Sequence, residues 1–218
     1  MRIVAVNGSL IEGGNTAALL SHAQGAYKAE TDVEVTRFDL ASMEVGHCRH
    51  CNWCLEKQEP GRYCSRDDSM SLVYPALLDC SAVLVATPVH FGRLSGATAD
   101  FLDRLRVFVH GNITARAMKN KVGGALSVAW FRNAGSEMAL LNVNTAFNVL
   151  GMLIAPSDLG VLGAAAFSSI DGMGERRGTD RLLVREDELG MAAARSLALR
   201  VLEVARIVEA GTRGAEKA

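Results

Sequence analysis

The sequence has little proline, few aromatic residues and almost no net charge. Of its 218 residues, 4 are proline and 6% are aromatic, and the formal net charge is -1. A chain so close to neutral has no overall basic field that would attract nucleic acid or an anionic membrane surface. We therefore do not expect nucleic acid as a partner.

Long hydrophobic runs are also missing. No apolar stretch approaches the roughly 20 residues that a helix needs to span a bilayer, and the start, MRIVAVNGS, lacks the basic and apolar regions of a signal peptide. Cysteines spread along the chain, as in secreted disulfide frameworks, are absent as well, since four of the five fall within 17 residues. We expect a soluble cytoplasmic protein that does not bind membranes.

Apolar runs and amphipathic segments alternate along the chain. Strand patterns are found at residues 2–6, 32–38, 81–87, 121–130 and 152–156. Helix patterns are found at residues 15–28, 67–78, 95–107, 135–150 and 187–209. This alternation predicts one α/β domain over residues 1–218, a doubly wound, flavodoxin-like five-stranded parallel sheet of order 2-1-3-4-5.

Two connections in this predicted fold are unusually long. The segment after strand 2 contains a cysteine-rich loop, residues 46–66. The segment 157–186 is rich in glycine and weakly periodic, which is more typical of a binding or oligomer-contact excursion than of a core element.

The loop between strand 1 and the first helix has the composition of a phosphate site. Its backbone amides, the side chains of Ser9, Asn15 and Thr16, and the helix N-terminus can together hold a phosphate. It is neither a Walker loop nor a dinucleotide GxGxxG loop, so a monophosphate fits best. The alternative is a tight turn with a helix cap and no ligand.

Two further loops lie at the same predicted edge of the sheet. Strand 3 is followed by Pro88, Val89, His90, Phe91 and Gly92, which can lie against a planar ring, unless the segment only ends the strand and buries Phe91.

Strand 4 is followed by Trp130 and Arg132. Arg132 can stabilise a reduced, anionic flavin ring, unless it is simply solvated beside a helix cap. No catalytic residue stands out, and His90 and Glu137 are weak candidates for proton delivery.

Together these loops resemble the NADPH-dependent FMN reductase family, over roughly residues 1–156. The resemblance is carried by NGSLIEGGNT and VATPVHFGRLSGATADFLDR. It implies that Ser9, Asn15 and Thr16 bind the FMN phosphate and that residues 88–92 pack beside the isoalloxazine ring. Family members often carry arginine where this chain has Ile11, so one phosphate contact is missing.

The cysteines Cys48, Cys51, Cys54 and Cys64 are spaced CxxCxxCx9C. Three thiols separated by pairs of residues, with a fourth closing the site, are typical of a [4Fe–4S] cluster. A zinc site and a thiol-disulfide switch are the alternatives. We expect the flanking His47 and His50 to be exposed, and Cys80 to be a small core residue.

With the cysteine motif CRHCNWCLEKQEPGRYC, the chain resembles the iron–sulfur flavoprotein branch of that family. The resemblance implies electron transfer between FMN, a [4Fe–4S] cluster and a redox partner such as ferredoxin. It also implies a homo-oligomer, dimer or tetramer, in which the cluster of one subunit approaches the flavin of another.

Three other functions remain open at this point. One is an NAD(P)H-dependent FMN or quinone reductase with a structural metal. Another is an FMN-dependent dehydrogenase of a small biosynthetic acid, which would be the substrate. The last is a non-enzymatic redox sensor.

Overall fold

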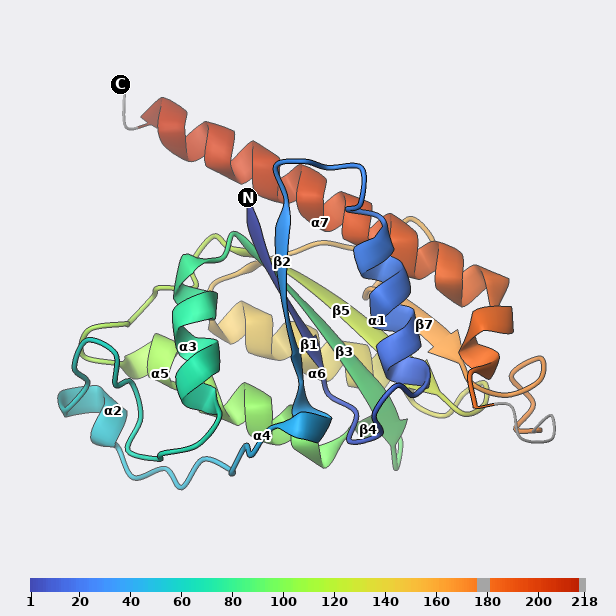
Figure 1. The fold of residues 1–218 in the computed structure, drawn as a ribbon, viewed down its shortest axis with the longest axis horizontal. Helices are drawn as coiled ribbons and strands as arrows, with labels where there is room; N and C mark the ends of the chain where they lie inside the picture. Colours follow the sequence, from blue (N-terminus) through green and yellow to red (C-terminus); the bar gives the residue numbers. More distant parts are fainter. Residues whose placement is uncertain (176–180, 216–218) are drawn as a thin grey trace.

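The computed structural model describes residues 1–175 and 181–215 and contains a twisted, mostly parallel sheet between two helical layers (Figure 1). The strands are β1 (Arg2–Asn7), β2 (Glu34–Asp39), β3 (Ala82–His90), β4 (Arg93–Leu94), β5 (Val122–Ala129), β6 (Leu153–Ile154) and β7 (Ala164–Phe167). The main path runs β2-β1-β3-β5-β6. Strand β7 also pairs with β5, nearer the carboxyl end of β5 than β6 does. The predicted flavodoxin-like α/β class is confirmed, and the main path has the predicted order, but the sheet has seven strands because β4 and β7 are added to it.

Burial explains why β3 and β5 are central. All eight residues of β5 and the first six of β3 are buried, which is the pattern of parallel strands covered on both faces. Gly123 in β5 makes room for Phe147, because a side chain at that position would overlap its ring. The central strands are thus fixed by apolar contacts on both sides.

Helices cover both faces of the sheet. One layer is formed by α1 (Asn15–Gly25) and α7 (Glu188–Ala215), which pack on the core that contains Ile3 and Leu84. The other layer contains α3 (Met70–Asp79), α4 (Gly96–Arg104), α5 (Val107–His110) and α6 (Ser136–Val149), on the core that contains Val4 and Val85. The short elements are α2 (Trp53–Glu56), η1 (Leu40–Ser42) and η2 (Leu183–Glu186).

The structure corrects three details of the sequence prediction. Pro88 does not end β3, since it pairs with Val128 and the strand continues to His90, where it turns back into β4. The fifth strand position is shared by β6 and β7, which pair with opposite ends of β5. Residues of β7 and Val184 are buried in the core, so part of the segment 157–186 is a core element and not an excursion. Residues 176–180 of this segment lie outside the described part.

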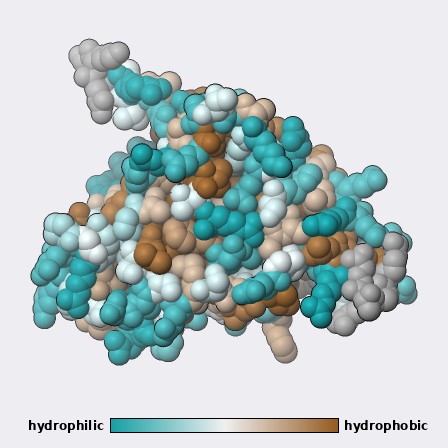
Figure 2. Space-filling view, viewed as in Figure 1, coloured by the Kyte–Doolittle hydropathy of each residue, from teal (hydrophilic) through white to brown (hydrophobic). Residues whose placement is uncertain are grey.

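The surface shown in Figure 2 is mostly hydrophilic, with small, scattered apolar areas. No helix in the described part of the chain is long and apolar enough to cross a membrane.

Candidate functional site

The floor of the candidate flavin site lies where β1 ends beside β3. The amide of Gly8 donates to the carbonyl of Ala86 at 2.7 Å, and Ser95 Oγ donates to the carbonyl of Gly8 at 2.9 Å. A side chain at Gly8 would overlap Thr98 Oγ1. A buried set of hydroxyl groups from β3 and α4 therefore fixes the start of the β1–α1 loop, a role that the sequence analysis missed.

The predicted phosphate residues Ser9, Asn15 and Thr16 lie together on this loop and at the start of α1. Ser9 Oγ accepts from the amide of Ile11 at 3.1 Å, so the hydroxyl also shapes the loop. Asn15 Oδ1 accepts from the amide of Val184 at 3.1 Å and joins the loop to η2. Thr16 is buried. Binding of phosphate by these residues stays a prediction.

The predicted ring residues lie in a hairpin, not in an open loop. Pro88, Val89 and His90 end β3, while Phe91 and Gly92 form the turn into β4 with left-handed φ values of 49° and 76°. The side chain of Phe91 is fully exposed. The alternative in which Phe91 is buried in the core is therefore wrong, and its ring is available to a planar ligand.

This turn contacts the loop after β5. Gly135 has a φ of 103°, and a side chain there would overlap the carbonyl oxygen of Gly92. Trp130 and Phe131 pack edge to face, with ring centroids 6.4 Å apart, and are about half exposed. The structure thus brings aromatic surface from two rim loops to one edge of the sheet.

Arg132 is held in place and is not a freely solvated side chain. Its Nε donates to the carbonyl of Asp171 at 3.0 Å, and its guanidinium lies 5.3 Å from the ring centroid of Phe167. The cation is therefore held near the rim by the last residue of β7 and by the segment that follows it. His90 and Glu137 are both exposed, and their assignment to proton delivery remains a prediction.

The four clustered cysteines share one cavity. Cys48, Cys51, Cys54 and Cys64 all line it and all carry free thiols. The loop bends sharply between them, because His50 and Asn52 have left-handed φ values of 52° and 61°. His47 and His50 are exposed, and Cys80 is buried away from the cavity, as predicted.

Several contacts fix the cysteine loop on α3 and on the segment that follows α5. The carbonyl of Cys54 accepts from the amide of Asn112 at 3.2 Å, and buried Gln58 is hydrogen-bonded to Thr114 at 3.0 Å. Tyr63 packs edge to face on Tyr74, with ring centroids 6.0 Å apart. The thiols are thus carried by a scaffold that is packed on the main core.

The thiol environments differ in polarity. The hydrogen bond of Cys51 with Ser65 Oγ, together with backbone contacts and the charge of Arg49, lowers the pKa of Cys51. Burial raises the pKa of the Cys54 thiol, and the charge of Arg106 partly offsets this effect.

The residues of this cavity fit an iron–sulfur cluster. Four thiols are the donor set that a [4Fe–4S] cluster requires, and the positive side chains Arg104 and Arg106 also line the cavity. Over residues 1–175 and 181–215, no group of three or more histidine, cysteine or acidic side chains is arranged to hold a metal ion. Binding of a cluster by the four thiols therefore stays a prediction.

The cysteine cavity lies in a different part of the molecule from the predicted flavin rim, which is formed by the β1–α1 loop, the Phe91 turn and the loop after β5. In Figure 1, α2 lies at the left end, whereas β4 lies toward the lower right, beneath α1. A groove of about 620 Å³ is lined by residues from both regions, including Cys48 of the cysteine loop and Arg93, which is next to the Phe91 turn.

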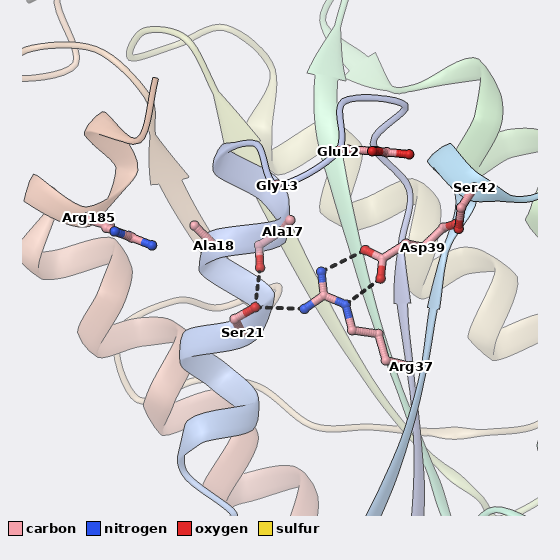
Figure 3. Close-up of a pocket in the computed structure, with 9 residues that line it drawn as sticks. All are labelled: Glu12, Gly13, Ala17, Ala18, Ser21, Arg37, Asp39, Ser42 and Arg185. Carbon is pink, nitrogen blue, oxygen red and sulfur yellow. Dashed lines mark hydrogen bonds and ion pairs between the residues drawn. The ribbon is translucent and has the colours of Figure 1, made fainter. Parts of the chain in front are cut away.

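A further cleft of about 420 Å³ lies between α1 and β2 (Figure 3). On its floor Arg37 forms two hydrogen bonds with Asp39, at 2.8 and 2.7 Å, and a third with Ser21 Oγ at 2.8 Å. Arg37 lowers the pKa of Asp39 by this hydrogen bonding. Since these polar groups satisfy one another, we assign them to the support of α1 on the sheet.

Comparison with known proteins gives consistent results. The model of the NADPH-dependent FMN reductase family matches residues 1–166. An iron–sulfur flavoprotein of Methanocaldococcus jannaschii is 31% identical over 180 residues, 82% of this chain and 84% of that protein. An NAD(P)H dehydrogenase (quinone) of Afipia carboxidovorans is 28% identical over 152 residues, 69% of this chain and 68% of that protein.

Among solved structures, RosB with a bound 8-demethyl-8-formylriboflavin-5'-phosphate intermediate superposes with a TM-score of 0.70 at 16% identity. The match covers 100% of this chain and 87% of RosB. At this identity the likeness describes the fold alone.

Proposed function

Because the chain belongs to the NADPH-dependent FMN reductase family and is a flavin-dependent oxidoreductase, we propose that it passes electrons between FMN, a [4Fe–4S] cluster and a redox partner. FMN supplies the conversion between two-electron and one-electron transfer. The finer proposal is supported above all by the shared cavity of Cys48, Cys51, Cys54 and Cys64.

The chain's own residues would bind and orient the two groups. In this proposal Ser9, Asn15 and Thr16 hold the phosphate, the Phe91 turn and Trp130 contact the ring, and Arg132 provides positive charge beside it. The exposure of Phe91 and the fixed position of Arg132 support these assignments. A partner such as ferredoxin would exchange single electrons with the cluster.

The cysteine cavity and the predicted flavin site lie in different parts of the molecule, which supports the expectation of a homo-oligomer. Electron transfer between distant centres of one chain is slower than transfer between centres that a second copy brings together. We propose that the groove between Cys48 and Arg93 accommodates part of a second subunit, so that the cluster of one copy approaches the flavin of the other.

The test is the metal content of anaerobically purified protein and of two cysteine variants. We expect about four irons and four sulfides per chain in the wild type, with FMN bound and a visible spectrum of both groups. Cys51→Ala should lose iron and sulfide but keep FMN, since Cys51 is exposed and lies outside the flavin rim.

Cys80→Ala is the matched control, because Cys80 is buried in the core and should leave both contents unchanged. Zinc without sulfide in the wild type would instead favour a reductase with a structural metal. Equal iron loss in both variants would show that the loss reflects general destabilisation.

A further inference from the structure

Four arginine side chains surround the cysteine cavity. Arg49, Arg66, Arg104 and Arg106 all line it together with the thiols, and within the described part of the chain its lining contains no aspartate or glutamate. Asp68, outside this lining, offsets part of the charge by pairing with Arg66 at 3.3 Å and Arg104 at 2.5 Å. The remaining positive charge favours an anion in the cavity. A cluster held by four thiolates is an anion of this kind, and reduction makes it more negative.

Arg104 has a donor for which the protein supplies no acceptor. Its side chain is 1% exposed, and its guanidinium forms hydrogen bonds with Asp68, at 2.5 and 3.1 Å, and with the carbonyl of Gly46 at 2.7 Å. Its buried Nε has no hydrogen-bond partner among the described residues. A buried N–H without an acceptor costs free energy, and a cluster sulfur in the cavity that Arg104 lines would supply one.

Arg106 reaches a thiol directly. Its Nη1 lies 3.7 Å from Cys54 Sγ, while its Nη2 donates to Asn52 Oδ1 at 2.8 Å. Asn52 has a left-handed backbone in the bend between Cys51 and Cys54. One nitrogen of the guanidinium is thus held by Asn52 of the cysteine loop, and another lies close to Cys54, one of the predicted cluster ligands.

We propose that these four arginines compensate the charge of the cluster and raise its reduction potential. One-electron reduction adds a negative charge to the cluster, so positive side chains and N–H donors to its sulfurs stabilise the reduced form more than the oxidised form. This inference rests on the proposed function, because it requires the cluster to be present. It goes further by assigning the tuning of that centre to residues outside the cysteine motif.

The experiment is a redox titration of the holoprotein with dithionite as the electron donor, followed by the visible and electron paramagnetic resonance spectra of the cluster. We expect Arg106→Gln to shift the midpoint potential to more negative values, with iron and sulfide contents like those of the wild type. Arg106→Lys should restore most of the potential, because it keeps the positive charge. Arg62→Gln is the matched control, since Arg62 stacks on Trp53 at 5.1 Å and is not among the lining residues.

A fully loaded Arg106→Gln protein with the wild-type potential would overturn the inference. If that variant does not load, Arg49→Gln decides in its place, because Arg49 is an exposed loop residue near Cys51 and should shift the potential in the same direction. An unshifted potential in a loaded Arg49→Gln protein would then overturn it. A wild-type protein without iron and sulfide would contradict the proposed function itself, which is a different result.

Discussion

At the scale of single residues, the pair Arg104–Asp68 joins two parts of the molecule. Both side chains are almost completely buried, at 1% and 4% exposure. Asp68 Oδ1 also accepts from the amide of Met70 at 3.2 Å at the start of α3, and Arg104 ends α4. The pair therefore fixes the cysteine loop between two helices. Removal of one partner from a buried pair is far more costly than the net contribution of the pair suggests, because it leaves a buried charge.

Stability should depend on the ionisation of Asp68. Burial by itself would raise the pKa of this carboxyl, but the hydrogen bonds and the charge of Arg104 outweigh that effect and hold it below its usual value. A carboxyl whose pKa is lower in the folded protein adds stability above its unfolded pKa, about 3.9, and loses that contribution as the pH falls through the folded value. We expect Asp68→Asn to have a flatter stability profile than the wild type below about pH 5.

Urea unfolding at a series of pH values measures this difference. Asp158→Asn is the control, because it removes the same charge from an exposed position and should leave the wild-type profile unchanged. If the unfolding free energies of the wild type and Asp68→Asn fall equally with pH, the acid dependence of stability does not come from Asp68.

A separate variant, Arg104→Met, should lower the unfolding free energy by about 3–5 kcal/mol at neutral pH.

At the scale of elements, two turns form the predicted ring side of the candidate flavin site. The β3–β4 turn and the loop before α6 touch at Gly92 and Gly135, and Gly135 has a φ of 103° that L side chains rarely adopt. Their contact depends on the missing side chain at Gly135. The positions of Phe91 and Trp130 therefore depend on a contact between two backbone segments, which is possible because residue 135 is glycine.

Gly135→Ala should destabilise the rim. The new Cβ would overlap the carbonyl of Gly92, and relief of such overpacking typically costs about 1–3 kcal/mol. We expect a lower urea midpoint and weaker FMN binding, measured by flavin fluorescence quenching. Gly96→Ala in the first turn of α4 is the matched control, since nothing surrounds a Cβ there and its φ is ordinary, so stability should stay equal or rise. Unchanged FMN affinity in Gly135→Ala would show that the contact between Gly92 and Gly135 does not shape the flavin site.

At the scale of the whole molecule, FMN should act as a stabilising ligand. The predicted phosphate loop joins β1, α1, η2 and, through Gly8, β3 and the N-terminus of α4. A ligand that binds only the folded chain stabilises it by mass action, by about 2.7 kcal/mol at a hundredfold excess over Kd. Because the loop links elements of both helical layers, this stabilisation should extend to the global unfolding transition.

Thermal unfolding of the FMN-free protein tests this expectation. At a hundredfold excess of FMN over Kd we expect the midpoint to rise by about 5–10 °C, given the size of the chain. Riboflavin, which lacks the phosphate, should give a smaller rise, and Ser9→Ala should reduce the difference between the two ligands. Equal shifts with FMN and riboflavin would mean that the loop does not hold the phosphate.

Much of this organisation follows from local sequence patterns. The buried runs of β3 and β5, the glycine-rich loop after β1 and the spacing of the four cysteines are read from neighbouring residues, since periodicity and turn chemistry act over short distances. The same patterns led to the wrong end of β3 at Pro88. Proline removes only its own donor, and the strand continues because His90 finds a partner in Arg93 of β4.

The order of the elements, the fold class and the presence of a four-cysteine loop follow from local sequence, because each depends on residues close together in the chain. Folding is needed to bring Arg104 and Arg106, at the end of α4 and just beyond it, to the cavity of cysteines some fifty residues earlier. The tertiary structure also decided that β7 completes the sheet and that Gly92 meets Gly135. These are contacts between distant segments, which arise only when both faces of the sheet are covered and its rim loops are brought together.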